Sequence, residues 1–117
     1  MFNIFRKKVT EPEISYAQAC IIEVDFAGLD EFGSEEQRKK ILHLLKLIED
    51  QLKPPANVDG YEYGEGNATI YIYGPSAEAL FRTIEPTLKE SPFNYMTITL
   101  QYGLPNESDT ISKSFSL

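Results

Sequence analysis

Residues 64–81 read Gly64-Glu-Gly-Asn-Ala-Thr-Ile-Tyr-Ile-Tyr-Gly-Pro-Ser-Ala-Glu-Ala-Leu-Phe81, and they carry the strongest structural signal in this chain. Gly64 and Gly66 flank one glutamate and supply the positive φ that a hairpin turn needs. Alternation then places Ala68, Ile70 and Ile72 on one strand face and Thr69, Tyr71 and Tyr73 on the other. Gly74-Pro75 ends the strand, and Ser76 is placed to cap a helix. The stretch predicts a turn, a central strand, a second turn and the start of a helix.

The remaining segments have regular patterns as well. Further strands are predicted at residues 14–27, 57–63, 95–102 and 111–117, and helices at residues 35–53 and 76–90. Ser34 and Gln37 form a capping box before the first helix, and Pro54-Pro55 stops it. Gly60 predicts a bulge or an edge in its strand. The second helix is expected to continue past Pro86.

The order of these elements predicts the fold. Two strand–helix–strand units with right-handed crossovers give a ferredoxin-like βαββαβ sandwich of the α+β class, with one extra C-terminal edge strand. We expect an antiparallel five-stranded sheet in the order 2-3-1-4-5, with both helices on one face. Residues 1–12 are predicted to be a flexible N-terminal segment and residues 13–117 a single domain.

Composition limits the partners. The 117 residues carry a net charge of −7, and three of the eleven basic residues lie in Arg6-Lys-Lys8, so the chain from Val9 onward is more acidic still. Such a surface repels nucleic acid and attracts a cationic partner. No apolar run approaches the roughly 18 residues that span a bilayer. We expect no nucleic-acid partner, no membrane partner and a cytoplasmic location.

Few residues indicate chemistry. Cys20 is the single cysteine and lies in an apolar strand, which predicts a buried thiol and fits a reducing cytoplasm. His43, the single histidine, is predicted to be a helix-surface or packing residue and not a catalytic one. No Ser, Cys or Thr has a base and an orienting group at motif spacing. The sequence therefore predicts no catalytic residue and no cofactor, and it favours a protein that is not an enzyme.

Acidic residues raise the alternative of a metal site. Glu23 and Asp25 share one strand face and could meet Glu62 or Glu65 from a neighbouring strand, giving oxygen ligands for Mg²⁺ or Ca²⁺. No ligand loop accompanies them, so a solvated acidic face is the preferred interpretation and no metal is predicted.

The third strand is similar to the RNA-stacking strand of RNA-recognition domains, which share this element order. Glu65, however, stands where a basic residue is expected, and Glu23 and Asp25 stand where an aromatic ring should stack. Carboxylates beside the RNA path oppose the phosphate attraction that supplies most of the affinity. The RNA hypothesis is therefore rejected.

The sheet face that the helices leave open carries the candidate binding residues, which are Tyr71, Tyr73, Glu23, Asp25, Thr97 and Thr99. Tyrosines surrounded by acids suit a cationic protein surface. The leading hypothesis is a non-enzymatic protein-interaction domain, for example an immunity-type protein that neutralises a basic nuclease. The alternative is a small-molecule-binding or enzymatic domain whose site forms between the open sheets of a homodimer.

The run Gly66-Asn-Ala-Thr-Ile-Tyr-Ile-Tyr-Gly-Pro-Ser-Ala-Glu-Ala-Leu-Phe81, with Ile84-Glu-Pro86 and Tyr102-Gly-Leu-Pro105 after it, resembles a group of small uncharacterised bacterial proteins. The resemblance covers roughly residues 20–117. It implies a ferredoxin-like domain in a bacterial cytoplasm. It implies no activity, and no functional residue is carried over from it.

Overall fold

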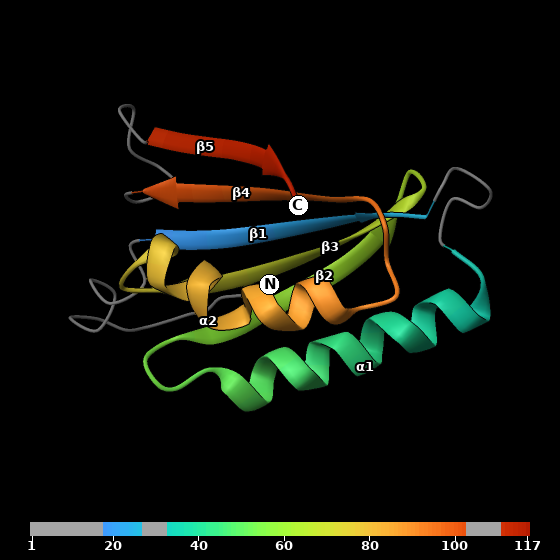
Figure 1. Cartoon of the computed structure of the whole chain (residues 1–117), viewed down its shortest axis with the longest axis horizontal. Coiled ribbons are helices and arrows are strands. Elements are labelled where there is room, and N and C mark those ends of the chain that lie inside the picture. Colours follow the sequence, from blue (N-terminus) through green and yellow to red (C-terminus); the bar gives the residue numbers. More distant parts are fainter. Residues whose placement is uncertain (1–17, 27–32, 103–110) are drawn as a thin grey trace.

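The computed structural model describes residues 18–26, 33–102 and 111–117 (Figure 1). Its elements are β1 Gln18–Asp25, α1 Glu35–Gln51, β2 Asn57–Gly64, β3 Asn67–Gly74, α2 Ala77–Glu90, β4 Met96–Tyr102 and β5 Ile111–Ser116. The predicted N-terminal segment, the predicted first-strand residues 14–17 and 27, and the loop at residues 103–110 lie outside the described residues.

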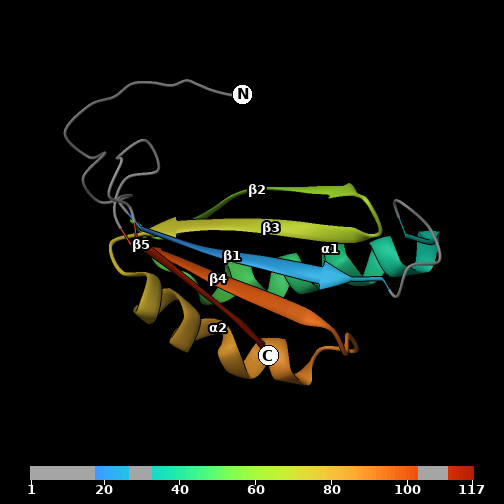
Figure 2. The ribbon, with the colours of Figure 1, turned by 90° about the horizontal axis from the view of Figure 1, so that it is seen from above.

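The sheet has the predicted topology. Its five strands run in the order β2-β3-β1-β4-β5, and every neighbouring pair is antiparallel. This is the ferredoxin-like βαββαβ arrangement with β5 added at the β4 edge, so the fold prediction is confirmed. Both helices lie on the same side of the sheet, as Figure 2 shows.

The core lies between the sheet and this helix layer. Three central strands contribute the predicted apolar faces: Cys20, Ile22 and Val24 from β1, Ala68, Ile70 and Ile72 from β3, and Met96, Ile98 and Leu100 from β4, with Phe26 directly after β1. The helices cover them with Ile41, Leu44, Leu45 and Ile48 of α1 and Ala77, Leu80, Ile84 and Leu88 of α2. Burial of this continuous apolar surface supplies the main driving force for folding.

The helix ends follow the capping signals. Ser34 and Gln37 form the predicted capping box, with hydrogen bonds of 3.1 and 2.9 Å. Helix α1 ends at Gln51, two residues before the predicted end, because Leu52 is already extended ahead of Pro54-Pro55. Ser76 caps α2, and this helix continues through Pro86 to Glu90 as expected.

The β2–β3 turn differs from its prediction in one respect. Glu65 itself has a positive φ of 56°, beside Gly66 at 82°, whereas Gly64 is the last residue of β2. Two central residues with positive φ define a type I′ turn, the type that matches the twist of a two-residue hairpin. The strained position is therefore occupied by a glutamate and not by the glycine that precedes it.

Among the helices of the described residues, none has the length and apolarity needed to cross a membrane.

Candidate functional site

The sheet face opposite the helices is organised in rows across the strands. The register aligns Glu62 of β2, Thr69 of β3, Glu23 of β1, Thr97 of β4 and Ser116 of β5. The next row holds Gly60, Tyr71, Ile21, Thr99 and Ser114, and the third holds Asn57, Tyr73, Ala19, Gln101 and Ser112. All six predicted site residues therefore share this open face, with Asp25 beyond the first row and opposite Asn67.

A β-bulge decides that Glu62 belongs to this face. Val58 pairs with Ile72, but Gly60 pairs with Tyr71, so β2 uses one extra residue between these two pairs. Strict alternation from Val58 would have directed Glu62 toward the helices. The inserted residue reverses the phase, and Glu62 instead lies beside Thr69 on the open face.

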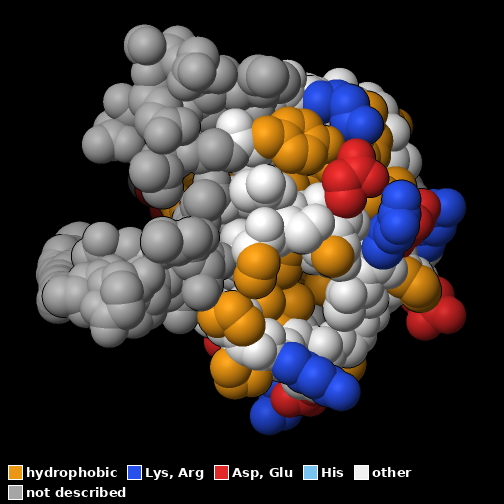
Figure 3. All heavy atoms as spheres, turned by 90° about the vertical axis from the view of Figure 1, so that its left-hand side faces the viewer, with side chains coloured by type: hydrophobic (Ala, Val, Ile, Leu, Met, Phe, Trp, Pro, Cys, Tyr) orange, Lys and Arg blue, Asp and Glu red, His pale blue; other side chains and the backbone are white. Residues whose placement is uncertain are grey.

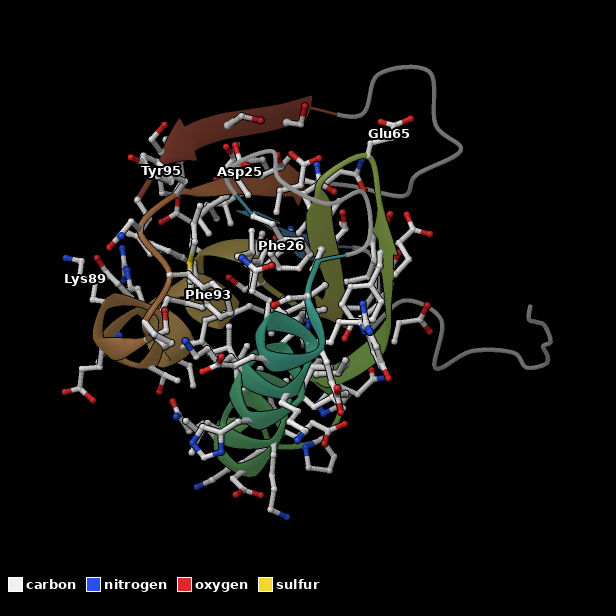
Figure 4. All side chains as sticks on the ribbon, turned by 90° about the vertical axis from the view of Figure 1, so that its right-hand side faces the viewer. Asp25, Phe26, Glu65, Lys89, Phe93 and Tyr95 are labelled. Atoms are coloured by element: carbon white, nitrogen blue, oxygen red, sulfur yellow. The ribbon has the colours of Figure 1, made fainter. Side chains whose placement is uncertain are left out.

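The open face has a hollow of about 530 Å³ over β1, β2 and β3, which we call the acidic hollow. Three carboxylates line it, those of Glu23, Glu62 and Glu65, and its other lining residues include Ile21, Thr69, Tyr71 and Thr99. Among the described residues, no lysine or arginine lines it. Figure 4 shows Glu65 at the tip of the β2–β3 hairpin, far from either helix.

The structure brings together only part of the predicted set. Glu23, Tyr71 and Thr99 line the acidic hollow, whereas Asp25, Tyr73 and Thr97 lie on the same face outside it. In the sequence, Glu62 and Glu65 are predicted only as candidate metal ligands, and Thr69 is not among the predicted binding residues. The missing information was the register of β2, which places Glu62 and Glu23 on either side of Thr69.

Tyr71 is the best-anchored side chain of the acidic hollow. Its hydroxyl donates a 2.8 Å hydrogen bond to Oε2 of Glu62. Burial raises the pKa of Tyr71 to about 12, with further contributions from the hydrogen bond and charge of Glu62 and from Tyr73 and Glu23. The phenol therefore keeps its proton at neutral pH and donates it in the hydrogen bond to Glu62. The phenol oxygen can still accept a hydrogen bond from a ligand.

Thr69 differs from the other polar residues on this face because it is buried. It is only 9% exposed and is a buried polar residue that lines the acidic hollow. Within the described residues, no hydrogen bond uses its hydroxyl. Buried hydroxyl groups normally have a partner, because leaving one unpaired costs free energy.

The two sides of the molecule differ in charge. The basic residues of the described ranges all lie on the helix side: Arg38, Lys39, Lys40, Lys46 and Lys53 on or just after α1, Arg82 and Lys89 on α2, and Lys113 of β5, whose Nζ lies 3.5 Å from Glu78 of α2. Glu23, Asp25, Glu62 and Glu65 carry the charge of the other side. The charged side chains on the described part of the open face are therefore carboxylates, and they lie over β1, β2 and the β2–β3 turn.

A second hollow of about 530 Å³ lies at one end of the helix layer, between the end of α1 and the start of α2. It is largely apolar, with Leu52, Ala56, Pro75, Ala79 and Leu80 in its lining. Figure 3 faces this end of the molecule and shows hydrophobic side chains gathered between charged ones. Among the described residues of its lining, Lys53 is the one titratable group, and no acid, histidine or cysteine accompanies it.

The described residues form neither a metal-binding cluster nor a reactive thiol. No cluster of three or more His, Cys, Asp or Glu residues is arranged to hold a metal ion there. Cys20 is fully buried, and this burial raises its thiol pKa to about 12, so it is not a nucleophile at neutral pH. His43 is exposed on α1, on the side of the sheet away from the acidic hollow. The arrangement on the open face is suited to binding.

No family model matches this sequence, and no curated protein and no solved structure matches it either.

Proposed function

We propose that this protein is a non-enzymatic interaction domain that binds a cationic surface of another protein through its open sheet face. The observation that carries the proposal is the separation of charge, with all described basic residues on the helix side and only carboxylates on the open face. A face whose charges have one sign accelerates association with a partner of opposite charge and discourages other partners.

The rest of the open face supports protein binding. Tyr71 and Tyr73 are partly exposed there, and tyrosine is enriched where interfaces concentrate their energy. Hydroxyl groups on β4 and β5 continue the face, where Thr99 and Ser114 share a 2.8 Å hydrogen bond. The face thus combines aromatic anchors with polar groups that can pair across an interface.

Charge disfavours the alternative of a homodimer with facing sheets. Two open faces that met with their acidic hollows opposed would place Glu23, Glu62 and Glu65 of one copy against the same carboxylates of the other. Like charges brought together in this way oppose association. A cationic partner is therefore preferred over a second copy of the chain. A site for a small molecule between two copies is disfavoured for the same reason.

An immunity-type protein is one concrete form of this proposal. A small acidic domain is suited to a basic nuclease, whose own nucleic-acid site must be cationic. The resemblance to small bacterial proteins would place such a pair in a bacterial cytoplasm.

The test is differential capture from a lysate of the native cells at low salt. The immobilised baits are the wild-type chain, the double variant Glu23→Gln/Glu62→Gln, and the matched control Glu49→Gln/Glu90→Gln. Both double variants change the net charge from −7 to −5, but the control residues are exposed on α1 and α2. We expect a basic protein to be captured by the wild type and the control and lost from the open-face variant. Equal capture by all three baits, or no captured protein, would contradict the proposal.

A further inference from the structure

We propose that the acidic hollow is a pocket for the guanidinium group of an arginine side chain of the partner. The inference rests on the proposed function and deepens it, because it names the chemical group that the open face recognises. Its volume of about 530 Å³ lies within the range of about 300–1,000 Å³ that is usual for binding pockets.

The buried hydroxyl of Thr69 is the observation that points to a ligand. Thr69 is 9% exposed, lines the acidic hollow and has no hydrogen-bond partner within the described residues. An apolar, β-branched side chain would fill the same buried position of the strand without leaving a hydroxyl group unpaired. A ligand that donates a hydrogen bond into the hollow would pair this hydroxyl.

The remaining polar groups identify the ligand as a cationic donor. The register places Glu62 and Glu23 on opposite sides of Thr69, two strand spacings or about 10 Å apart. Glu65 adds a third carboxylate from the turn. The Tyr71 proton is already donated to Glu62, which leaves the phenol oxygen as an acceptor. Such a set of acceptors fits a group with several N–H donors and a positive charge.

Arginine meets these requirements better than lysine. A guanidinium group carries five N–H donors spread in a plane, so it can bond carboxylates on two sides and the Thr69 hydroxyl together. The ammonium group of lysine is compact and strongly hydrated. Ile21 and the ring of Tyr71 also line the hollow, and a guanidinium plane packs on such surfaces and stacks on aromatic rings.

The experiment uses capped pentapeptides, Gly-Gly-X-Gly-Gly, in which X is arginine, citrulline or lysine. Each is titrated at low ionic strength into the ¹⁵N-labelled full chain, and amide shifts are followed by NMR. Citrulline has the shape of arginine without its charge. We expect the arginine peptide to shift the amides of Glu23, Glu62 and Thr69 first, and the citrulline peptide to shift none of them.

Substitutions of Thr69 separate the hydroxyl from the general negative charge. Thr69→Val keeps the shape of the side chain and replaces the hydroxyl by a methyl group. We expect this variant to melt at a higher temperature than the wild type, because an unpaired buried hydroxyl is gone, and to bind the arginine peptide about tenfold more weakly. Thr69→Ser retains the hydroxyl and should retain binding, which a merely structural role of Thr69 would not explain.

Failure of the arginine peptide to bind would overturn the inference, and so would any of three further results. The first is equal binding of the lysine and arginine peptides, and the second is arginine binding that Thr69→Val leaves unchanged. The third is tighter binding of free arginine than of the capped peptide, which would indicate a small amino-acid ligand. If the peptide fails to bind but capture from the lysate still depends on Glu23 and Glu62, only the arginine pocket is wrong. Peptide binding without any captured protein would remove the proposed partner and leave the pocket.

Discussion

Glu65 has a backbone conformation that residues with a β-carbon rarely adopt, at a φ of 56°. The cost of the left-handed region is about 1–2 kcal/mol for such a residue, and asparagine tolerates it better than glutamate. The same glutamate lines the acidic hollow. Strain of this kind is commonly retained where a side chain has a function, which fits a role of Glu65 in binding.

Replacement of Glu65 should therefore stabilise the fold. Glu65→Asn creates the Asn-Gly pair that type I′ turns prefer, and we expect the free energy of unfolding to rise by about 0.5–1 kcal/mol. Urea denaturation measures this change. Glu65→Ala is the control, because it removes the charge but keeps a β-carbon at positive φ. An equal gain in the alanine variant would show that charge, and not backbone strain, causes the effect.

The raised pKa of Tyr71 predicts how the stability of the fold depends on pH. Because the pKa of Tyr71 is about 12 in the folded chain and 10.0 ordinarily, the folded state holds this proton more tightly. Its contribution to stability is thus complete below pH 10 and is lost as the pH rises through about 12.

The Glu62→Gln variant separates the two main causes of this shift. We expect the pKa of Tyr71 to fall on loss of the neighbouring charge but to stay above 10.0, because burial is the largest cause. NMR titration of tyrosine labelled with ¹³C at the ζ carbon reads the value directly, with Glu49→Gln as the control. An unchanged pKa in Glu62→Gln would contradict the role given to the Glu62 carboxylate.

Strand β3 is the element that separates the hydrophobic core from the open face. It lies between β2 and β1, and its alternating residues divide cleanly between the helix layer and the open face. Ala68, Ile70 and Ile72 are fully buried beneath the helices. Thr69, Tyr71 and Tyr73 lie on the open face, between the residues of β2 and those of β1.

Substitutions on the two faces of β3 should have unequal effects. Ile72→Asp places an unpaired charge at a position with 0% exposure, and we expect it to abolish cooperative folding. Tyr73→Ala removes a partly exposed side chain and should cost much less stability. Thermal melting followed by circular dichroism compares them. Similar losses of melting temperature would mean that the faces of β3 are wrongly assigned.

At the scale of the whole molecule, charge is distributed by layer. The helix side pairs its charges, as in the ion pairs Glu78–Arg82 at 3.5 Å and Glu85–Lys89 at 3.0 Å. Glu23, Glu62 and Glu65 line the acidic hollow, and its described lining includes no basic residue. Pairing at the surface contributes little stability in either case, so this distribution bears on recognition more than on folding.

Neutralising the open face should barely change stability. Two carboxylates about 10 Å apart repel by only about 0.4 kcal/mol in water, so Glu23→Gln/Glu62→Gln should remain within about 0.5 kcal/mol of the wild type. The small gain in the free energy of unfolding should shrink as salt is added, because salt screens the repulsion that the variant removes: the Debye length is about 10 Å at 0.1 M. Chemical denaturation at low and high salt measures both. A loss of several kcal/mol would show that these carboxylates are structural, a result not expected for the control Glu49→Gln/Glu90→Gln.

The amino-acid sequence alone determined the fold, because the signals that specify it are local. Alternation along β1, β3 and β4 assigns their faces, and the Ser34 capping box and Pro54-Pro55 mark where α1 begins and stops. Once the order of elements is known, right-handed crossovers leave one arrangement of the first four strands. These properties depend on neighbours within a few residues of each other.

Only the tertiary structure decided the acidic hollow, because strand register is a long-range property. Glu23 lies about 40 residues before Glu62 in the chain, and they meet on either side of Thr69 only through the pairing of β1 and β2 with β3. The bulge between Val58 and Gly60 then sets which face Glu62 occupies. A shift of one residue would turn that carboxylate toward the helices, since side chains alternate with a period of two. Alternation within β2 could not predict the face that Glu62 occupies, because the bulge in the pairing with β3 exchanges the two faces of β2 after Val58.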